Sequence, residues 1–381
     1  MSSEVDTLIV GAGFAGLATA WQLSRLEPSE RILIIEREKK LGGQSSGNNA
    51  GMLRQAVADR AIARLAREGR RLFNSLKGPR WRGLRLAPSG SLLLASNGCK
   101  EWREIEAAAG AERVDLRILD RDQAACLVPV LQTSVFRRAL FCPGDASLDI
   151  RGFLKGLTRE LRSRGILIHL GISPQGIFKT KRGFLVLAGR GVFRARRIVN
   201  TAGAWAGGIA RMAGAARIPF RAYRRHLYTS GAFKGAGPSW PFVWDLEKKF
   251  YFRPSGSGCS LILSPCDKEF FDIKRRRFGL DNRTDPRLRR VVRKKMERFS
   301  PAFRGLKLTA EQAGLRTMAP DGRFVIGEDP RLEGFYWVAG LGGHGVTTSL
   351  SAGRMAARLI LGKKTDPFLE RAFSPRRFHA A

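Results

Sequence analysis

The sequence predicts an α/β fold in which a parallel-sheet domain, discontinuous in sequence, carries an inserted domain built on an antiparallel sheet. Three observations lead to this prediction. An apolar run, a glycine-rich turn and a helical pattern open the chain at residues 7–26. Residues 217–265 alternate apolar and polar side chains as strands do. The chain then returns to turn, strand and helix patterns at residues 314–361.

The first strand, turn and helix contain a nucleotide-binding pattern. TLIV is a short buried strand and LATAWQLSRL has helical periodicity. Between them GAGFAG places Gly11, Gly13 and Gly16 at the spacing of a Rossmann-like turn. The first glycine allows the tight turn, the second lets the backbone approach a pyrophosphate, and the third permits close packing of helix on strand.

A second strand completes a βαβ unit. RILIIE, residues 31–36, is a continuous apolar run typical of a parallel strand buried on both faces. It ends in Glu36, 20 residues after Gly16. A carboxylate at this place can accept hydrogen bonds from a ribose diol. The pattern therefore predicts a dinucleotide site.

The remaining elements divide the chain between two domains. Periodicity predicts helices at residues 55–76, 100–109, 149–165 and 286–299. Strand patterns occupy residues 82–96 and the runs ILIHL, GFLVLAG, RARRIVN, RRHLYTS, KKFYFRP and SLILSP. We expect an FAD- or NAD-binding domain of residues 1–80, 140–215 and 305–381, and a substrate-binding domain of residues 81–139 and 216–304.

Composition excludes some classes and leaves the partner open. The hydrophobic fraction of 44% is ordinary for a globular protein, and no apolar run is suited to span a bilayer. The five cysteines lack metal-ligand spacing, so we expect reduced thiols, no metal and a cytoplasmic location. A net charge of +35 favours an anionic partner, such as a membrane surface or nucleic acid. The alternative is that the basic residues only solvate the surface.

The basic segment 285–299 shows the same alternatives. Its apolar residues have helical spacing, which predicts a helix with one face on the core and a basic face to solvent. The alternative is peripheral contact with the inner face of an anionic membrane, which would suit electron transfer to a quinone. Vesicle pelleting at low salt tests that contact.

Three later segments distinguish between FAD and NAD as the bound dinucleotide. REKKLGGQSSGNNAGML after Glu36 is rich in glycine and serine, and NTAGAW follows an apolar strand. GLGGHGVTTS places a second glycine loop before a helix, whose N-terminus would stabilise negative charge on a reduced flavin. With GLRTMAPDGRFVIG and the closing FSPRRF, this order resembles the D-amino acid oxidase-like FAD-dependent oxidoreductases, from Asp6 to Phe378. Within that family, CLVPVL, NTAGAWAGGIARMAG, YRRHL and KKFYFRP resemble D-arginine dehydrogenase.

The resemblance implies FAD as the cofactor and a set of residues that hold it. The implied cofactor-binding residues are Gly11, Gly13, Phe14, Ala15, Gly16, Glu36, Arg37, Ser45, Ser46, Asn49, Ala50, Gly51, Met52, Thr201, Ala202, Gly203, Trp205, Gly342, Gly343, His344, Gly345, Val346, Thr347 and Thr348. Gly314 stands where sarcosine oxidase-type enzymes carry the cysteine that tethers flavin, so we expect non-covalent FAD.

The resemblance also implies the catalytic residues Arg225, Arg316 and Tyr251. His344 is a further catalytic candidate, at a position where the related dehydrogenase has tyrosine. The two arginines would clamp a substrate carboxylate, because a guanidinium can bind it through two hydrogen bonds. Arg225 is favoured over Arg224 because only one of two neighbours on a strand faces the pocket. Tyr251 would contact the same carboxylate, and for His344 we expect a positional role rather than proton abstraction.

Other positions depart from the D-arginine dehydrogenase pattern. Its acidic residue that pairs with a cationic substrate falls at Ser91, so strong arginine preference is not expected. The histidine and threonine of the flavin-side loop in D-arginine dehydrogenase align with Met52 and Arg54 of this sequence. The segment NAGML looks more like glycine oxidase.

The resulting functional prediction is oxidation of the C–N bond of a D-amino acid or N-alkyl glycine by hydride transfer to flavin N5. The imine product would hydrolyse to a keto acid or aldehyde, and oxygen or a quinone would accept the electrons. The alternatives are a 2-hydroxy acid dehydrogenase and an FAD enzyme that oxidises a modified amine in tRNA. The tRNA alternative is disfavoured because the sequence shows no appended RNA-modifying domain and no aromatic and basic recognition motif, so we do not expect a nucleic-acid partner.

Overall fold

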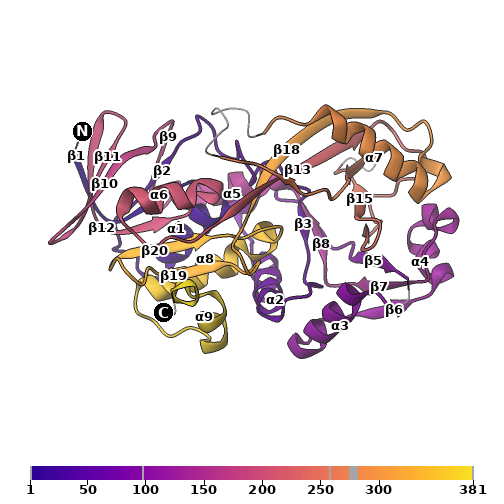
Figure 1. Cartoon of the computed structure of the whole chain (residues 1–381), viewed down its shortest axis with the longest axis horizontal. Coiled ribbons are helices and arrows are strands. Elements are labelled where there is room, and N and C mark those ends of the chain that lie inside the picture. The colour runs from indigo at the N-terminus through magenta and orange to yellow at the C-terminus, as the bar shows by residue number, and fades with distance from the viewer. Residues whose placement is uncertain (1, 97, 257–258, 274–281, 380–381) are drawn as a thin grey trace.

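The computed structural model describes residues 2–96, 98–256, 259–273 and 282–379. Their strands form an eight-stranded, a nine-stranded and a three-stranded sheet. Figure 1 shows the first sheet and its helices in one lobe, together with both chain ends, and the second sheet in the other lobe. The predicted α/β fold with a parallel and an antiparallel part is confirmed.

The first sheet has a parallel centre. Its parallel strands, in spatial order, are β20 (Phe335–Ala339), β12 (Gly191–Asn200), β1 (Ser2–Val10), β2 (Ile32–Glu36) and β9 (Leu167–Leu170). The antiparallel strands β10 (Pro174–Thr180), β11 (Gly183–Ala188) and β19 (Val325–Glu328) extend it.

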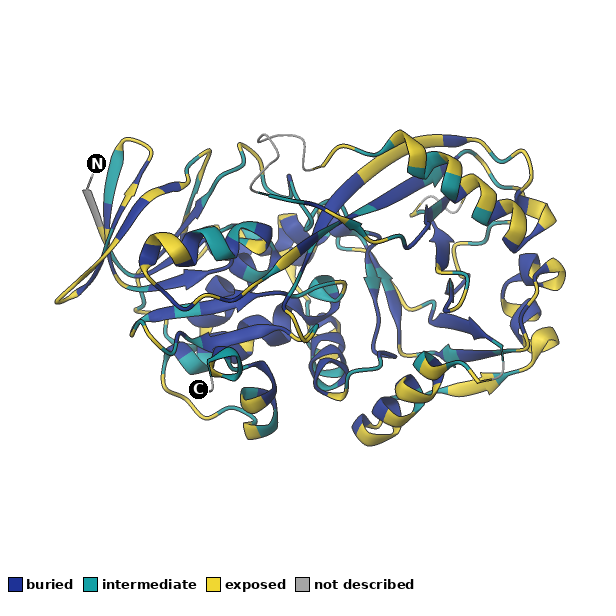
Figure 2. Ribbon diagram, in the orientation of Figure 1, coloured by how far each residue is buried: buried dark blue, intermediate teal, exposed yellow. Residues whose placement is uncertain are grey.

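Both faces of this sheet are covered, which explains the apolar runs of its strands. On β1, Ile9 packs into one core cluster, whereas Leu8 and Val10 pack into the cluster on the opposite face. The first cluster includes side chains from α1 (Phe14–Leu26), α2 (Arg60–Asn74), α5 (Ile150–Arg162), α8 (Gly345–Ile360) and α9 (Pro367–Phe373). The second includes α6 (Ala206–Ala213). Figure 2 shows β2, β19 and β20 as largely buried, whereas β9 and β10 are more exposed.

The helix predicted at residues 55–76 is shorter than expected. It begins at Arg60, because the Asp59 side chain accepts a hydrogen bond from the Ile62 amide and caps the helix. Before it, the Gln55 amide donates to the buried carboxylate of Asp145 at 2.8 Å, which holds this segment outside the helix. The predicted start at residue 55 was therefore wrong.

The second sheet is antiparallel except for one parallel pair, β5 with β14. Its strands are β5 (Ser91–Ala95), β6 (Arg117–Leu119), β7 (Arg138–Cys142), β13 (Arg221–Ser230), β14 (Phe242–Asp245), β15 (Phe250–Pro254), β16 (Leu261–Ser264), β17 (Glu269–Phe270) and β18 (Leu308–Met318). Beside it lie α3 (Lys100–Glu112), α4 (Arg121–Leu127) and α7 (Pro286–Phe299). Strands β3 (Met52–Leu53), β4 (Leu86–Ala87) and β8 (Ala146–Leu148) form the smallest sheet.

Strand β18 lies in the range 305–381, which we assigned to the cofactor domain, yet it pairs with β13 of the second sheet over its length. Figure 1 shows the two as a long ribbon that reaches from one lobe to the other. The sheets therefore do not divide at residue 305, and the full domain boundaries stay a prediction.

Helix α7 shows the predicted two-faced character. Val292, Met296 and Phe299 are buried in the core of the second lobe. Its arginines and lysines are exposed or half-buried, as the outer side of this helix in Figure 2 shows. Among the described helices, none combines the length and apolar character that a membrane crossing requires.

A buried histidine makes the stability of the second lobe sensitive to acid. His226 on β13 accepts a hydrogen bond at Nε2 from the Asp285 amide at 3.0 Å, and burial lowers its pKa below the ordinary value. Below pH 6.5 the unfolded chain therefore binds more protons at this residue, so stability falls as the pH falls. We expect the loss to approach ~1.4 kcal/mol per pH unit. Thermal unfolding from pH 7.5 to 5.5 checks this.

The variant His226→Gln provides the control, because glutamine keeps an acceptor and does not titrate. Its unfolding temperature should fall less between pH 7.5 and 5.5 than that of the unmodified protein. An equal fall in both proteins would contradict the assignment.

Candidate functional site

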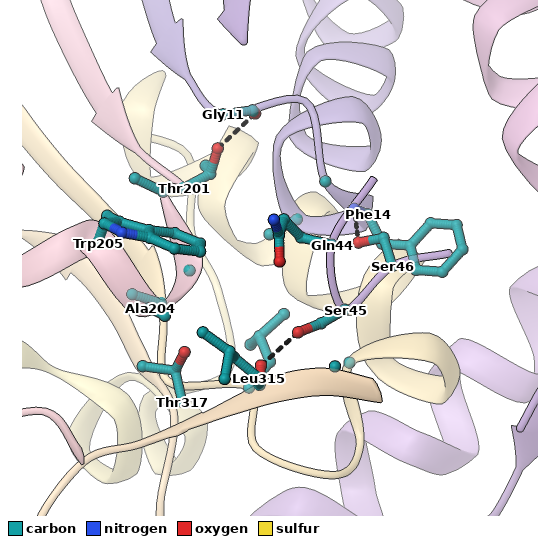
Figure 3. Close-up of a pocket in the computed structure, with 18 of the residues that line it drawn as sticks. Gly11, Phe14, Gln44, Ser45, Ser46, Thr201, Ala204, Trp205, Leu315 and Thr317 are labelled. Carbon is teal, nitrogen blue, oxygen red and sulfur yellow. Dashed lines mark hydrogen bonds between the residues drawn. The ribbon is translucent and has the colours of Figure 1, made fainter. Parts of the chain in front are cut away.

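One large cavity receives side chains or backbone from both lobes. Its volume is about 720 Å³, and its lining extends from the GAGFAG turn to strands β13, β15 and β18. In Figure 3, Thr201, Ala204 and Trp205 lie on one side of the cavity, and Phe14, Ser45 and Ser46 lie on the other. This volume is in the upper part of the range of roughly 300–1,000 Å³ that ligand sites occupy.

The glycines of the first turn are required by close backbone approach. Gly11 has φ +110°, and a Cβ there would lie 2.7 Å from the Thr201 carbonyl oxygen. A Cβ at Gly16 would lie 1.9 Å from the Gly11 carbonyl oxygen. At Gly13 the nearest atom is the Ser46 hydroxyl at 3.0 Å. The three glycines thus allow α1 to begin against the cavity.

The N-terminus of α1 faces this cavity. Its first turn carries no acidic residue and no side chain caps it at Gly13. The Phe14 amide donates to the Ser46 hydroxyl at 2.9 Å, as Figure 3 shows. Because the amides and the helix dipole favour negative charge, this end is suited to a pyrophosphate.

Glu36, for which we predict a ribose contact, lies at the end of β2. It lines the cavity, and its carboxylate accepts hydrogen bonds from the Ala12 amide at 2.7 Å and the Glu38 amide at 2.8 Å. Two carboxylate oxygens offer about four acceptor positions, so a diol can still bind. The neighbouring Arg37 stacks on the Trp205 ring at 3.6 Å.

The glycine- and serine-rich segment after Glu36 joins the two lobes. Ser45 donates a hydrogen bond to the Leu315 carbonyl on β18, and Asn49 donates to the Ser46 carbonyl at 2.7 Å. The Asn49 side chain accepts from the Gly51 amide at 2.8 Å. Gly51 has φ +64°. The segment is therefore a folded wall of the cavity rather than a loose loop.

The second glycine loop lies before α8. Gly340 and Gly342 have φ values of +71° and +52°, which favour glycine, and the Gly342 amide donates to the Thr317 carbonyl at 3.0 Å. Helix α8 begins at Gly345 with no side-chain cap and no acidic residue in its first turn. A second helix N-terminus therefore adjoins the cavity, at the end near β18.

The structure places most predicted cofactor residues on the lining. Those that line it are Gly11, Gly13, Phe14, Ala15, Glu36, Arg37, Ser45, Ser46, Asn49, Ala50, Gly51, Met52, Thr201, Ala202, Gly203, Trp205, Gly342, Gly343, Gly345 and Val346. Four do not line it: Gly16, His344, Thr347 and Thr348. Thr347 instead accepts from the Arg54 amide at 2.9 Å, and Thr348 donates to the His344 carbonyl at 2.9 Å. Contact of any of these residues with a cofactor stays a prediction.

The two predicted clamp arginines share one face of the second sheet. Arg225 lies opposite Gly314 across β13 and β18, and Arg316 is two residues further along β18. Opposite and alternate residues point to the same face, so both side chains point toward the cavity, which both line. Arg224 points away and pairs with Glu269 at 2.8 Å.

Neither clamp arginine is neutralised by a carboxylate of the described chain. Arg225 donates to the Asp267 carbonyl at 2.7 Å, while its buried Nε has no partner. Burial and the charge of Arg316 lower the pKa of Arg225 to about 10. The Arg316 guanidinium has no hydrogen-bond or ion-pair partner among the described residues and lies against Gly343. The pair therefore presents unpaired positive charge to a ligand.

Tyr251 and His344 differ in their access to the cavity. Tyr251 is buried on β15 and lines the cavity, and burial raises the pKa of its hydroxyl. The pKa of His344 is well below its usual value because of desolvation and the positive charges of Arg54 and Arg316. His344 is therefore neutral near pH 7, and its catalytic role stays a prediction.

Several lining residues were missed by the sequence analysis. Leu227 is two residues after Arg225 on the same strand, so strand alternation could have found it. Gln44 lies within the segment already singled out, and Phe271 and Ile172 carry no motif. Ser91 does not line the cavity and donates to the buried Asp145 carboxylate at 2.7 Å.

Arg253 connects the sheet to the cofactor segment. It is buried on β15, and its guanidinium donates to the Ala50 and Pro254 carbonyls. We expect Arg253→Met to lower the free energy of unfolding by about 2–4 kcal/mol, because two buried carbonyls lose their donors. Urea unfolding measures this.

The control for Arg253→Met is Arg138→Met. Arg138 lies in the same sheet and stacks on Trp102 at 4.8 Å, and its buried Nε has no hydrogen-bond partner. Its loss therefore removes charge, length and stacking, but no donor to a buried carbonyl. Equal effects of the two substitutions would show that the carbonyl contacts do not stabilise the fold.

The fold and this cavity together define a dinucleotide-dependent oxidoreductase. Residues 6–359 match the model of the DAO family, described as FAD dependent oxidoreductase, and the chain belongs to this family. Its cofactor is therefore FAD, for which the two glycine loops, the open helix ends and the acid at Glu36 provide fitting donors and acceptors.

Three similar proteins illustrate the relationship. The mitochondrial sarcosine dehydrogenase of Homo sapiens is 24% identical over 390 residues, which is 100% of this chain and 42% of that protein. The FAD-dependent oxidoreductase domain-containing protein 1 of Bos taurus is 27% identical over 405 residues, which is 93% of this chain and 81% of that protein. The crystal structure of L-proline dehydrogenase from P. horikoshii has a TM-score of 0.87 at 21% identity, with 100% and 99% of the two chains covered. The chain thus spans about two-fifths of the sarcosine dehydrogenase.

Proposed function

We propose that the chain oxidises the C–N bond of an amino acid, either an amino acid with a primary amine or an N-alkyl amino acid, to an imine. The observation that carries this proposal is the pair of unneutralised arginines, Arg225 and Arg316, on the same cavity as the dinucleotide loops. Two guanidiniums on one face bind and orient a carboxylate through charge-assisted hydrogen bonds. When bound, FAD supplies the two-electron acceptor.

The charges around the site also favour the reactive form of the amine. Arg225 and Arg316 carry positive charge, and the neutral His344 does not offset it. Positive neighbours lower the pKa of an amine, so they favour the neutral amine that oxidation requires. Tyr251 adds a hydroxyl donor at the same face. In this arrangement the chain binds, orients and desolvates the substrate, and water then hydrolyses the released imine.

An anaerobic flavin spectrum tests the proposal. Amino acids of both configurations, N-alkyl glycines and 2-hydroxy acids are added in turn to the purified holoenzyme, and the flavin absorption band is followed. Bleaching by an amine supports the proposal, and readmission of air separates an oxidase from a dehydrogenase. Bleaching by hydroxy acids alone would replace it with 2-hydroxy acid oxidation, for which the same carboxylate clamp is suited.

A further inference from the structure

A third arginine lies beside the clamp and lacks a partner of opposite charge. Arg54 is only 9% exposed, and no side chain among the described residues forms an ion pair with it. Its Nη1 atom is buried without a hydrogen-bond acceptor. A buried cation without an acceptor is costly, so this arrangement indicates a ligand that supplies one.

A second donor lies beside Arg54. The guanidinium of Arg54 stacks on the Trp244 ring at 4.2 Å, and the Trp244 Nε1 atom is also buried without an acceptor. Two neighbouring groups that can only donate thus lack acceptors. An anion would satisfy both, whereas a second donor or an apolar group would satisfy neither.

This pair of donors lies beside the cavity without lining it. Trp244 contacts Tyr251 at a ring distance of 5.1 Å, and Tyr251 lines the cavity with Arg225 and Arg316. Arg54 follows Met52, a lining residue, by two positions in extended chain, while Leu53 between them packs into the core. Arg54 and Met52 therefore point to the same side, away from Leu53.

The nearest carboxylates of the chain are already engaged. Glu101 and Asp145 are the acidic residues whose charges act on Arg54. Glu101 accepts from Lys249 at 2.8 Å, and Asp145 accepts from the Ser91 hydroxyl at 2.7 Å and the Gln55 amide at 2.8 Å. Arg225, Arg316 and Arg54 together leave more positive charge than one carboxylate offsets.

We propose that Arg54 and Trp244 form a second anion-binding subsite and that the preferred substrates are amino dicarboxylates. The first carboxylate binds Arg225 and Arg316, and the second binds Arg54 and the Trp244 N–H. This inference rests on the proposed function, and it assigns Arg54 a role in specificity.

The test compares unreactive acids that differ only in the second carboxylate. Calorimetric titration of the holoenzyme at pH 7.5 uses succinate against butyrate, and glutarate against pentanoate. We expect each diacid to bind at least about tenfold more tightly than its monoacid, a difference of ~1.4 kcal/mol. Equal affinities in the unmodified enzyme would overturn the proposal without any variant.

Variants then assign the preference to the subsite. Arg54→Met should bind diacids no better than monoacids, with monoacid affinity within about twofold of the original, and Arg54→Lys should recover part of the preference. Trp244→Phe keeps the ring but removes the N–H, so it should reduce the preference about threefold. Arg138→Met, the matched arginine stacked on Trp102, should keep the full preference.

Three further outcomes separate the ways in which the proposal can fail. If Arg54→Met shifts the flavin midpoint potential but leaves the diacid preference intact, Arg54 serves the cofactor and the proposal is wrong. If amino monocarboxylates bleach the flavin but the diacids bind no more tightly than their monoacids, only this inference fails. If no acid binds and no amine bleaches the flavin, the proposed function fails with it.

Discussion

Replacing Gly16 by valine is expected to yield a protein that is purified without flavin. A Cβ at this position would lie 1.9 Å from the Gly11 carbonyl oxygen and 2.7 Å from the Thr201 hydroxyl. Either the turn or α1 must move, which displaces the helix N-terminus from the cavity. We expect FAD affinity to fall on the order of 100-fold, from the usual cost of overpacking. Flavin absorbance per protein and titration of the apoprotein with FAD measure this.

Gly110→Val is the matched control for this substitution. Gly110 lies in α3, and nothing approaches within 4 Å of a Cβ built there. The control should retain a full complement of FAD. Circular dichroism of Gly16→Val must show that the variant remains folded without flavin. A stoichiometric FAD content in that variant would show that the close contact is not needed for binding.

Replacing Arg316 by methionine is expected to lower kcat/KM for the amino acid substrate by roughly 30- to 4,000-fold. The range corresponds to ~2–5 kcal/mol for loss of one partner of a desolvated, hydrogen-bonded charge pair. Arg316 has no described partner of its own, so its removal leaves no carboxylate of the chain unpaired. Steady-state kinetics with the substrate found by the flavin assay measures the change.

Two variants test whether this loss depends on position rather than net charge. Arg221→Met removes an exposed arginine from the start of β13 and should leave kcat/KM within about twofold, because exposed charges are well screened. Arg316→Lys should recover part of the activity, since lysine keeps the charge but not the paired donors. A loss in Arg221→Met as large as that in Arg316→Met would mean that the clamp assignment is wrong.

The sequence predicted best where a local rule applied. The glycine spacing of GAGFAG predicted the close contact between Gly16 and Gly11, because both residues belong to the same turn. Alternation along β13 correctly separated Arg225 from Arg224. The helix at residues 286–299 was predicted with its limits and its core-facing side.

Prediction failed where distant segments decide the outcome. Residues 55–59 fit a helical pattern, but Asp145, far along the chain, holds the Gln55 amide. β18 follows the last strands of the insertion in sequence, yet its pairing with β13 could not be inferred from periodicity alone. The stacking of Arg54 on Trp244 joins segments almost 200 residues apart, and no motif links them.

The long pairing of β13 with β18 also sets how this site tolerates change. Apart from Thr309 at a register shift, each residue of β18 has a defined partner on β13, with Gly314 opposite Arg225 and Arg316 opposite Tyr223. A slip of one position would turn Arg316 to the opposite face and bring Leu315 toward the ligand. A substitution on either strand can therefore alter one contact with the ligand. A single-residue insertion within either strand would instead shift the register and eliminate carboxylate recognition. The pairing of the two strands fixes the spacing between Arg225 and Arg316. Insertions and deletions should therefore be tolerated only in the turns at the ends of the strands.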